Sequence, residues 1–259
     1  MSKNRVIAVT GKGGTGKTAL VAIMVKILAR DKRLKLLAID ADSAASLSQV
    51  LGVKVDKTIT DIREEIIKVP GARRKLADTN IRTVIAGITK QEGGIYLLVM
   101  GRPEGPGCYC AINDLLKYGI EALSREFAVT IVDGEAGPEQ INRRVLGNAD
   151  TLIIVADTSY RSIETAKSIL RIAESDESAR FANIGLVINR MRKGSEAIAQ
   201  HAQQMHLRIL GYVPDDENVA KYDLMGNPLL RLPDTSSSVT AVEGVLREIG
   251  LEMSQAGGT

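Results

Sequence analysis

Residues 11–18 read Gly-Lys-Gly-Gly-Thr-Gly-Lys-Thr, and they stand between an apolar run and a segment whose apolar residues have helical spacing. The run at residues 6–9 predicts a buried strand, and residues 19–28 predict the helix that follows. Strand, glycine-rich loop and helix in this order are the context of the phosphate-binding P-loop, whose spacing is G-x-x-x-x-G-K-T. We therefore expect this loop to hold the phosphates of a nucleoside triphosphate.

Each part of the loop has an expected task. The glycines let the backbone wrap around phosphate oxygens, and the N–H groups of the loop and helix start point inward. Lys17 should reach the β- and γ-phosphates, and the Thr18 hydroxyl should bind Mg²⁺. The residues predicted to bind the nucleotide here are Gly13, Gly14, Thr15, Gly16, Lys17 and Thr18.

The amino-acid composition limits the kinds of molecule that the protein is expected to bind. The chain has 259 residues, few aromatic residues, no Trp and a formal net charge of +3. Stacking platforms for single-stranded nucleic acid are therefore not expected, and the small charge requires neither nucleic acid nor anionic lipid. No apolar run approaches the ~20 residues of a membrane span, and a signal peptide is not expected, because the first residues pass directly into a strand pattern. We expect a cytoplasmic protein that binds neither nucleic acid nor membrane.

Apolar, β-branched runs alternate with helical patterns along the chain. This alternation predicts one α/β P-loop domain over residues 1–253, with a mostly parallel sheet of about seven or eight strands, helices on both faces and a loose tail at 254–259. Strands are expected at 5–10, 34–40, 95–100, 128–133, 151–156, 183–190 and 207–213. Helices are expected at 17–30, 60–68, 111–127, 138–146, 159–173, 195–204, 216–225 and 239–249. Residues 71–94 stay unassigned, apart from a short strand at 81–85.

Aspartates follow two of the predicted strands, where a parallel sheet collects its ligands. Asp40 and Asp42 follow the second strand, and Asp133 ends a later one. In P-loop enzymes such a carboxylate contacts Mg²⁺ directly or through its waters. One aspartate alone would be read as a helix cap or a solvated charge, but three beside a P-loop favour catalysis. Glu135 either takes part in catalysis or only hydrogen-bonds its loop.

Lys12 is a second lysine near the start of the loop, and with Lys17 and Thr18 it forms K-G-G-x-G-K-T. This pattern resembles the deviant Walker A motif of the superfamily that includes MinD, ParA, the arsenite-pump ATPase and the nitrogenase iron protein. The resemblance implies Mg²⁺-dependent hydrolysis of ATP to ADP and phosphate by a nucleotide-dependent homodimer. It also implies that Lys12 crosses the dimer interface and contacts the partner's nucleotide, where a cation stabilises the transferring phosphoryl group.

The resemblance assigns roles to residues along the rest of the chain. It implies that Asp42 in switch I orients or activates the attacking water, and that Asp40 and Asp133 lie near Mg²⁺. The residues that it implies for adenine recognition are Asn189, Pro214 and Asp215.

Cys108 and Cys110 are the only cysteines, in the run Gly-Cys-Tyr-Cys at residues 107–110. Two thiols are too few for a closed four-ligand zinc site in one chain, but a two-fold dimer would supply four. Four thiolates suit Zn²⁺, another metal that prefers soft ligands, or an iron–sulfur cluster. The alternative is a pair of ordinary small residues near a turn.

The cysteine pair resembles that of the CooC group, the ATPases that mature nickel-containing carbon monoxide dehydrogenase and the related acetyl-CoA synthase. The resemblance implies a metallochaperone that delivers nickel to such a client, with Ni²⁺ or Zn²⁺ bridged by Cys108 and Cys110 of two subunits. The switch II region of the group also resembles residues 133–140, although it often has His where Gln140 stands. A nitrogenase iron protein is rejected, because residues 134–142 contain no second cluster cysteine.

Besides the metallochaperone, two other classes of function are compatible with the same ATPase domain: a spatial organiser of the MinD or ParA type, and an iron–sulfur protein. An organiser of the MinD type needs a basic amphipathic C-terminal helix, but the polar side of residues 239–252 carries three glutamates and one arginine, which favours packing against the core. An organiser of the ParA type needs a basic DNA-binding surface, for which the short arginine clusters are weak support. The third function is an iron–sulfur cluster carrier or reductase.

Overall fold

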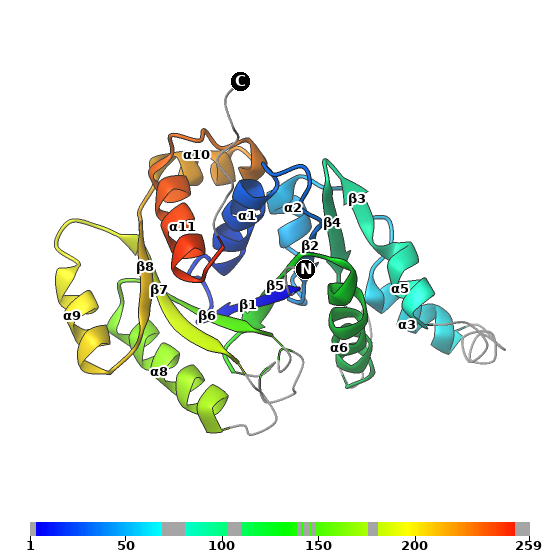
Figure 1. Ribbon diagram of the computed structural model, residues 1–259, viewed down its shortest axis with the longest axis horizontal. Helices are drawn as coiled ribbons and strands as arrows, with labels where there is room; N and C mark the ends of the chain where they lie inside the picture. The colour runs from blue at the N-terminus through cyan, green and yellow to red at the C-terminus, as the bar shows by residue number, and fades with distance from the viewer. Residues whose placement is uncertain are drawn as a thin grey trace.

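The structure, a computed structural model, describes residues 4–68, 81–102, 110–138, 141, 146, 149–175 and 181–251. It is one α/β domain, with a central eight-stranded sheet between two layers of helices (Figure 1). The strand order is β3-β4-β2-β5-β1-β6-β7-β8. All neighbouring strands are parallel except β3, which pairs with β4 in antiparallel fashion. The predicted fold class is therefore confirmed.

The strands form where aliphatic and β-branched residues run together, because both faces of this sheet are covered. Every residue of β2 and β6 is buried, for example. The strands are β1 (Arg5–Gly11), β2 (Leu36–Asp40), β3 (Lys90–Glu92), β4 (Ile95–Val99), β5 (Val129–Ala136), β6 (Thr151–Ala156), β7 (Asn183–Met191) and β8 (Ile209–Pro214).

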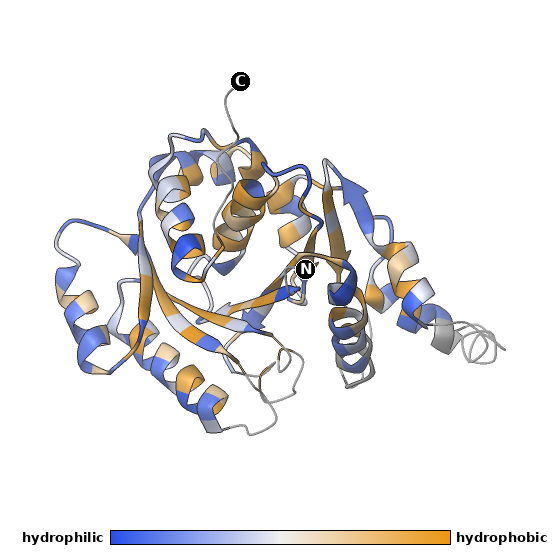
Figure 2. Cartoon of the chain, in the orientation of Figure 1, coloured by the Kyte–Doolittle hydropathy of each residue, from blue (hydrophilic) through white to orange (hydrophobic). Residues whose placement is uncertain are grey.

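The helices divide between the two faces. Figure 2 shows hydrophobic residues along the strands and along the sides of the helices that face them. One face carries α1 (Lys17–Leu28), α2 (Leu47–Leu51), α10 (Glu217–Leu224), the short 3₁₀ helix η2 (Leu229–Arg231) and α11 (Ser237–Glu248). The other carries α3 (Ile59–Lys68), α5 (Ile81–Ile88), α6 (Cys110–Leu123), α8 (Tyr160–Ser175) and α9 (Glu196–Gln204), with η1 (Ser124–Glu126) leading from α6 into β5.

The strand predicted at residues 81–85 is wrong, because these residues begin helix α5. The β-branched run is misleading on its own, since its apolar residues also recur at 81, 84, 85 and 88, the spacing of one helix face. Ile85 is buried, and it lies against Gly119 on α6, where a glycine lets the two helices approach closely. Tertiary packing on α6 thus decides in favour of the helix.

Several short elements were not predicted, namely α2, β3, η1 and η2. Each has only three to five residues, too few for hydrophobic periodicity to identify. The other predicted strands and helices are present within the described residues, with ends that shift by a few residues. Most of the helix predicted at 138–146 and the whole tail at 254–259 lie outside the described residues.

Helix α11 packs against the core, as its acidic polar side predicts. Its buried apolar residues join α1 and β8 in one hydrophobic cluster; they are Val239, Val242, Val245 and Leu246. An exposed membrane-binding face on this helix would need the same residues, so they cannot serve both purposes. Across the described part of the chain, no helix combines the length and apolar character needed to cross a bilayer.

Candidate nucleotide-binding site

The P-loop connects the end of β1 to the start of α1, as predicted. Gly11 has a φ of 149°, and a Cβ atom there would lie 2.1 Å from the Val155 carbonyl oxygen on β6. Gly14 and Gly16 have φ values of 81° and 85°, in the left-handed region that glycine adopts without strain. The Thr15 hydroxyl closes the loop by donating to the Lys12 carbonyl oxygen at 2.9 Å.

The start of α1 is left open for an anion. Its N-cap residue, Gly16, offers no side-chain cap, and the first turn contains no acidic residue. The first N–H groups of a helix have no partner within the helix, and together with the helix dipole they attract negative charge. A phosphate group meets both requirements.

Lys17 lies inside the loop, where its side chain is 7% exposed. Its ammonium group donates to the Lys12 carbonyl oxygen at 3.4 Å. Burial lowers the pKa of Lys17, and the nearby carboxylates of Asp133 and Asp42 partly oppose that change. The ammonium group therefore stands between the phosphate-binding loop and two carboxylates.

Asp40, the last residue of β2, and Asp133, three residues before the end of β5, lie at the same level, since they are register partners across the two strands. Both are fully buried. Asp40 accepts the N–H groups of Leu47 (2.8 Å) and Asp42 (3.2 Å), so it also holds the start of α2. Burial raises the pKa of Asp40 to about 6, although these hydrogen bonds act in the opposite direction.

Asp133 is more isolated. Neither of its carboxylate oxygens accepts a hydrogen bond of ordinary geometry from the described residues. Its pKa is raised to about 7, chiefly by burial and also by the charges of Asp40 and Asp42, while the Thr18 hydroxyl and Lys17 oppose the rise. A buried carboxylate without a strong partner is costly, so this position is suited to a cation.

The donor set beside the loop fits Mg²⁺. Thr18, Asp40 and Asp133 offer only oxygen atoms, which this hard cation prefers. In the described part of the chain no three acidic, His or Cys side chains form a preformed metal cage. Mg²⁺ in nucleotide sites does not need one, because it takes one or two carboxylates and completes its shell with phosphate and water. The Thr18 hydroxyl also lies 3.5 Å from that of Ser46, which precedes α2.

The segment after Asp133 is fastened to the base of the P-loop. The Thr10 hydroxyl contacts the carbonyl oxygens of Glu135 (3.1 Å) and Gly137 (3.0 Å). Gly137 in turn donates its N–H to the Gly11 carbonyl oxygen at 3.0 Å. The β1–β5 pairing shifts register between Val9 and Gly11, so that two residues of β5 stand opposite Thr10, one more than regular pairing would place there. This bulge follows Asp133 directly and is a feature that sequence reasoning missed.

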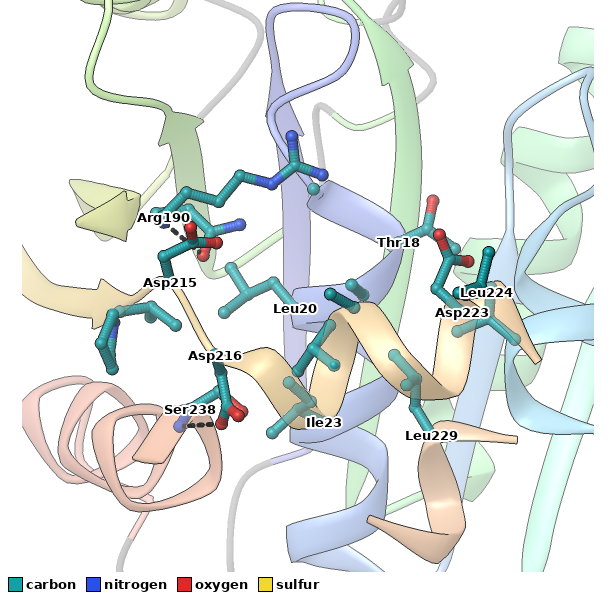
Figure 3. A pocket seen from close by; sticks show the side chains of 18 of the residues that line it. Thr18, Leu20, Ile23, Arg190, Asp215, Asp216, Asp223, Leu224, Leu229 and Ser238 are labelled. Carbon is teal, nitrogen blue, oxygen red and sulfur yellow. Dashed lines mark hydrogen bonds between the residues drawn. The ribbon is translucent and has the colours of Figure 1, made fainter. Parts of the chain in front are cut away.

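A pocket of about 640 Å³ opens beside the P-loop, between α1, α10 and the ends of β7 and β8 (Figure 3). Asn189, Pro214 and Asp215 line it, so the three residues predicted to meet adenine do come together. The Asn189 side-chain N–H donates to the Thr15 carbonyl oxygen at 2.8 Å, which ties the pocket to the loop. Asp215 is exposed and pairs with Arg192 at 2.7 Å.

Asp216 supports the wall of this pocket, a role that the sequence prediction missed. It caps α10 by accepting the Asn218 N–H, and it also accepts the Ser238 N–H at the start of α11, each at 2.9 Å. The Ser236 hydroxyl donates to it at 2.6 Å. The signal was present, because an aspartate just before a helical pattern is a common N-cap; its second partner, on α11, is set only by the fold.

The two cysteines are only partly placed. Cys110 is the first residue of α6, the helix between β4 and β5, and Cys108 lies outside the described residues. The switch II segment predicted to end at Gln140 likewise passes out of the described residues after position 138. The geometry of the cysteine site therefore stays a prediction.

The fold and this site define an α/β P-loop protein that binds nucleotide at the carboxyl ends of its parallel strands. The profile of the family described as the CobQ/CobB/MinD/ParA nucleotide binding domain matches residues 6–229. The chain therefore belongs to this family of P-loop NTPases.

Individual relatives agree with this assignment. An uncharacterized ATP-binding protein of Methanocaldococcus jannaschii is 38% identical over 94% of this chain and 98% of its own length. The carbon monoxide dehydrogenase accessory protein CooC of Rhodospirillum rubrum is 28% identical over 85% of this chain and 87% of its own. The solved structure of the septum site-determining protein MinD of Pyrococcus horikoshii, complexed with Mg-ADP, superposes with a TM-score of 0.69 at 22% identity, covering 95% of this chain and 96% of that one.

Proposed function

We propose that this protein is a cytoplasmic, Mg²⁺-dependent ATPase that works as a homodimer and loads nickel into a client metalloenzyme. The ATPase part rests on one observation above all: the charges of Asp42 and Asp133 act on Lys17 beside the P-loop, and Asp40 is level with Asp133. A phosphate-binding lysine, buried oxygen donors for a cation and a half-buried carboxylate are the groups that phosphoryl transfer to water requires.

The residues divide the work as follows. Lys17 and the N–H groups of the loop bind the β- and γ-phosphates, while Asn189, Pro214 and Asp215 hold the adenine. Asp42 accepts the Ala44 N–H at one oxygen, 2.9 Å away, and orients the attacking water with the other. Water attacks the γ-phosphorus, the bond to the bridging oxygen breaks, and ADP and inorganic phosphate leave. When bound by Thr18, Asp40 and Asp133, Mg²⁺ would neutralise charge on the phosphates.

Lys12 acts on the nucleotide of the partner subunit. Its carbonyl oxygen is used within the loop, but its ammonium group forms no hydrogen bond or ion pair with the described residues. The side chain is half-exposed at the carboxyl edge of the sheet, where a second copy could approach. A cation delivered only by dimerisation couples hydrolysis to assembly.

The nickel part rests on the cysteine pair and on the likeness to CooC. A two-fold dimer places Cys108 and Cys110 of both subunits around one metal ion, and four thiolates hold Ni²⁺ or Zn²⁺. The same dimerisation would then complete both the phosphate site and the metal site. Nucleotide turnover thereby loads and releases the metal, which a client of the carbon monoxide dehydrogenase type would receive.

One experiment tests both parts. The protein is purified anaerobically under reducing conditions, and phosphate release, oligomeric state and bound nickel, zinc and iron are measured with and without Mg-ATP. We expect phosphate release, ATP-promoted dimers and about one metal ion per two chains. Cys108→Ser should remove the metal and leave phosphate release largely intact, because Cys108 is not among the residues assigned to the phosphate site.

Each part can fail separately. Unchanged metal content in Cys108→Ser would contradict the metal site but leave the ATPase standing. Absence of phosphate release from metal-loaded dimers would contradict the ATPase. An iron–sulfur cluster in place of a single ion would favour a cluster carrier or reductase, and nucleotide-dependent binding to liposomes or DNA would favour an organiser of the MinD or ParA type.

A further inference from the structure

The residue after Asn189 has an unusual backbone. Arg190 has a φ of 56°, a left-handed conformation that residues with long side chains seldom adopt. Arg190 lies within β7, where the pairing with β8 shifts register, and its N–H donates to the Asn189 side-chain oxygen at 2.9 Å. This irregular backbone directs the Arg190 side chain towards the start of α1 (Figure 3). Strained residues of this kind concentrate at functional sites.

Arg190 and Asn189 together hold the P-loop. The guanidinium group of Arg190 donates to the Gly14 carbonyl oxygen at 3.1 Å, and Asn189 donates to that of Thr15. A Cβ atom on Gly16 would lie 2.4 Å from the Asn189 amide nitrogen and 3.9 Å from Nε of Arg190. The lack of a side chain at Gly16 thus allows both residues to approach the loop.

Among the described residues, no carboxylate forms an ion pair with the guanidinium group of Arg190. The start of a helix is the positive end of its dipole, and Lys12 and Lys17 add two more positive charges to the same loop. Arg192, two residues further on, forms an ion pair with Asp215, whereas no ion pair joins Arg190 to any carboxylate in the described ranges. A bound anion would reverse this unfavourable arrangement.

We propose that Arg190 binds the nucleotide at its α-phosphate, with the guanidinium group moving there from the Gly14 carbonyl oxygen. The inference rests on the proposed nucleotide site. Arg190 lines the pocket that holds the base and also reaches the loop that holds the terminal phosphates, so it stands at the part of the ligand between them. Because ADP and ATP share the α-phosphate, this contact contributes equally to binding both, and it changes little during phosphoryl transfer.

Arg190→Gly is the sharpest test, because glycine removes the guanidinium group and accepts the left-handed backbone. Titration calorimetry should show about a tenfold or larger loss of affinity for both ADP and ATP, the effect of losing a charged hydrogen bond. Affinity for adenosine should be unchanged, and kcat at saturating ATP should stay within about twofold. Arg190→Lys keeps the charge and should restore part of the affinity.

Arg171→Ala is the matched control, since it removes the same charge from an exposed position on α8, on the opposite face of the sheet. It should bind ADP like the wild type. If the wild type binds ADP and Arg190→Gly binds it equally well, the inference is wrong while the nucleotide site stands. An equal loss for adenosine would instead assign Arg190 to the base, and a loss for ATP alone would assign it to the γ-phosphate; either result overturns the proposal. If Lys17→Ala and the wild type both fail to bind ADP, the proposed function itself is wrong.

Discussion

At the scale of the residue, the site places two buried carboxylates where water cannot solvate them. Asp133 has a pKa raised to about 7 and Asp40 one raised to about 6, in each case chiefly by burial. An acid whose pKa is raised by folding destabilises the folded state once it must ionise. Above these pKa values, the two ionised carboxylates therefore lower the free energy of unfolding when no cation is bound. Binding of a cation with the nucleotide offsets that loss.

This arrangement predicts a pH dependence of stability in the ligand-free protein. The folded pKa of Asp133 lies above its unfolded value of roughly 4, so its contribution is fully present below that value and is lost as pH rises through about 7. The raised pKa of Asp40 has the same effect on stability, whereas Lys17 and the Thr18 hydroxyl limit the rise in the pKa of Asp133. Urea denaturation in EDTA should show a free energy of unfolding that falls by about 2 kcal/mol or more between pH 5 and pH 8.

The substitution Asp133→Asn tests how much of this pH dependence comes from Asp133 alone. The amide has nearly the same shape but cannot ionise, so the variant should lose much of the pH dependence and be more stable than the wild type at pH 8. Mg-ADP should then stabilise the wild type more than the variant. A pH profile in the variant identical to that of the wild type would contradict the assignment to Asp133.

At the scale of the element, Asp216 joins the starts of α10 and α11, and α10 forms one wall of the base pocket. Burial alone would raise the pKa of Asp216, but hydrogen bonds from Ser236, Ser238 and Asn218 outweigh it and hold the pKa well below its usual range. Its contribution to stability is therefore present above the unfolded pKa of roughly 4 and is lost as pH falls through the lower folded pKa. The stabilising contribution of Asp216 is therefore lost as pH falls, whereas that of Asp133 is lost as pH rises.

Asp216→Ala should lower the free energy of unfolding by about 2–3 kcal/mol at pH 7, because it removes two helix caps and leaves buried donors without partners. Glu217→Ala removes the same charge from the next, exposed residue and should cost within about 0.5 kcal/mol. Urea denaturation of both variants measures the difference. Equal effects of the two substitutions would show that Asp216 is not a specific cap.

The elements also show how far sequence reasoning reaches. The P-loop and the aspartates at strand ends could be placed because each has a fixed position relative to a strand, and parallel strands end together. Helix α5 could not be predicted, because its β-branched segment of eight residues fits the periodicity of a strand as well as that of a helix. Its packing on α6 decides between the two. The bulge opposite Thr10 and the left-handed backbone at Arg190 lie where the pairing of two strands shifts register, so no local pattern identifies them.

At the scale of the whole molecule, a homodimer is expected to complete two sites with one contact. In the proposed dimer, Lys12 would act on the partner's nucleotide, and the two thiols of each chain would be joined by the two of its partner. The half-exposed Lys12 ammonium group, which contacts none of the described residues, is consistent with this arrangement but does not distinguish action in cis from action in trans. Two variants that are each inactive for a different reason can distinguish action of Lys12 in cis from action in trans.

Lys12→Ala should bind ATP but lose at least about a thousandfold in kcat, as when an arginine finger is removed, and Lys17→Ala should lose nucleotide binding at its own loop. Each homodimer is then inactive. In a mixed dimer, the Lys12→Ala chain retains a complete P-loop and receives Lys12 from the Lys17→Ala chain, so one of the two sites can work. Phosphate release should therefore reappear on mixing, reach a maximum near equal amounts, and approach a quarter of the wild-type rate if dimers form at random. If Lys12 acted within its own chain, neither half of the mixed dimer would have both lysines, and the mixture would stay as inactive as its components.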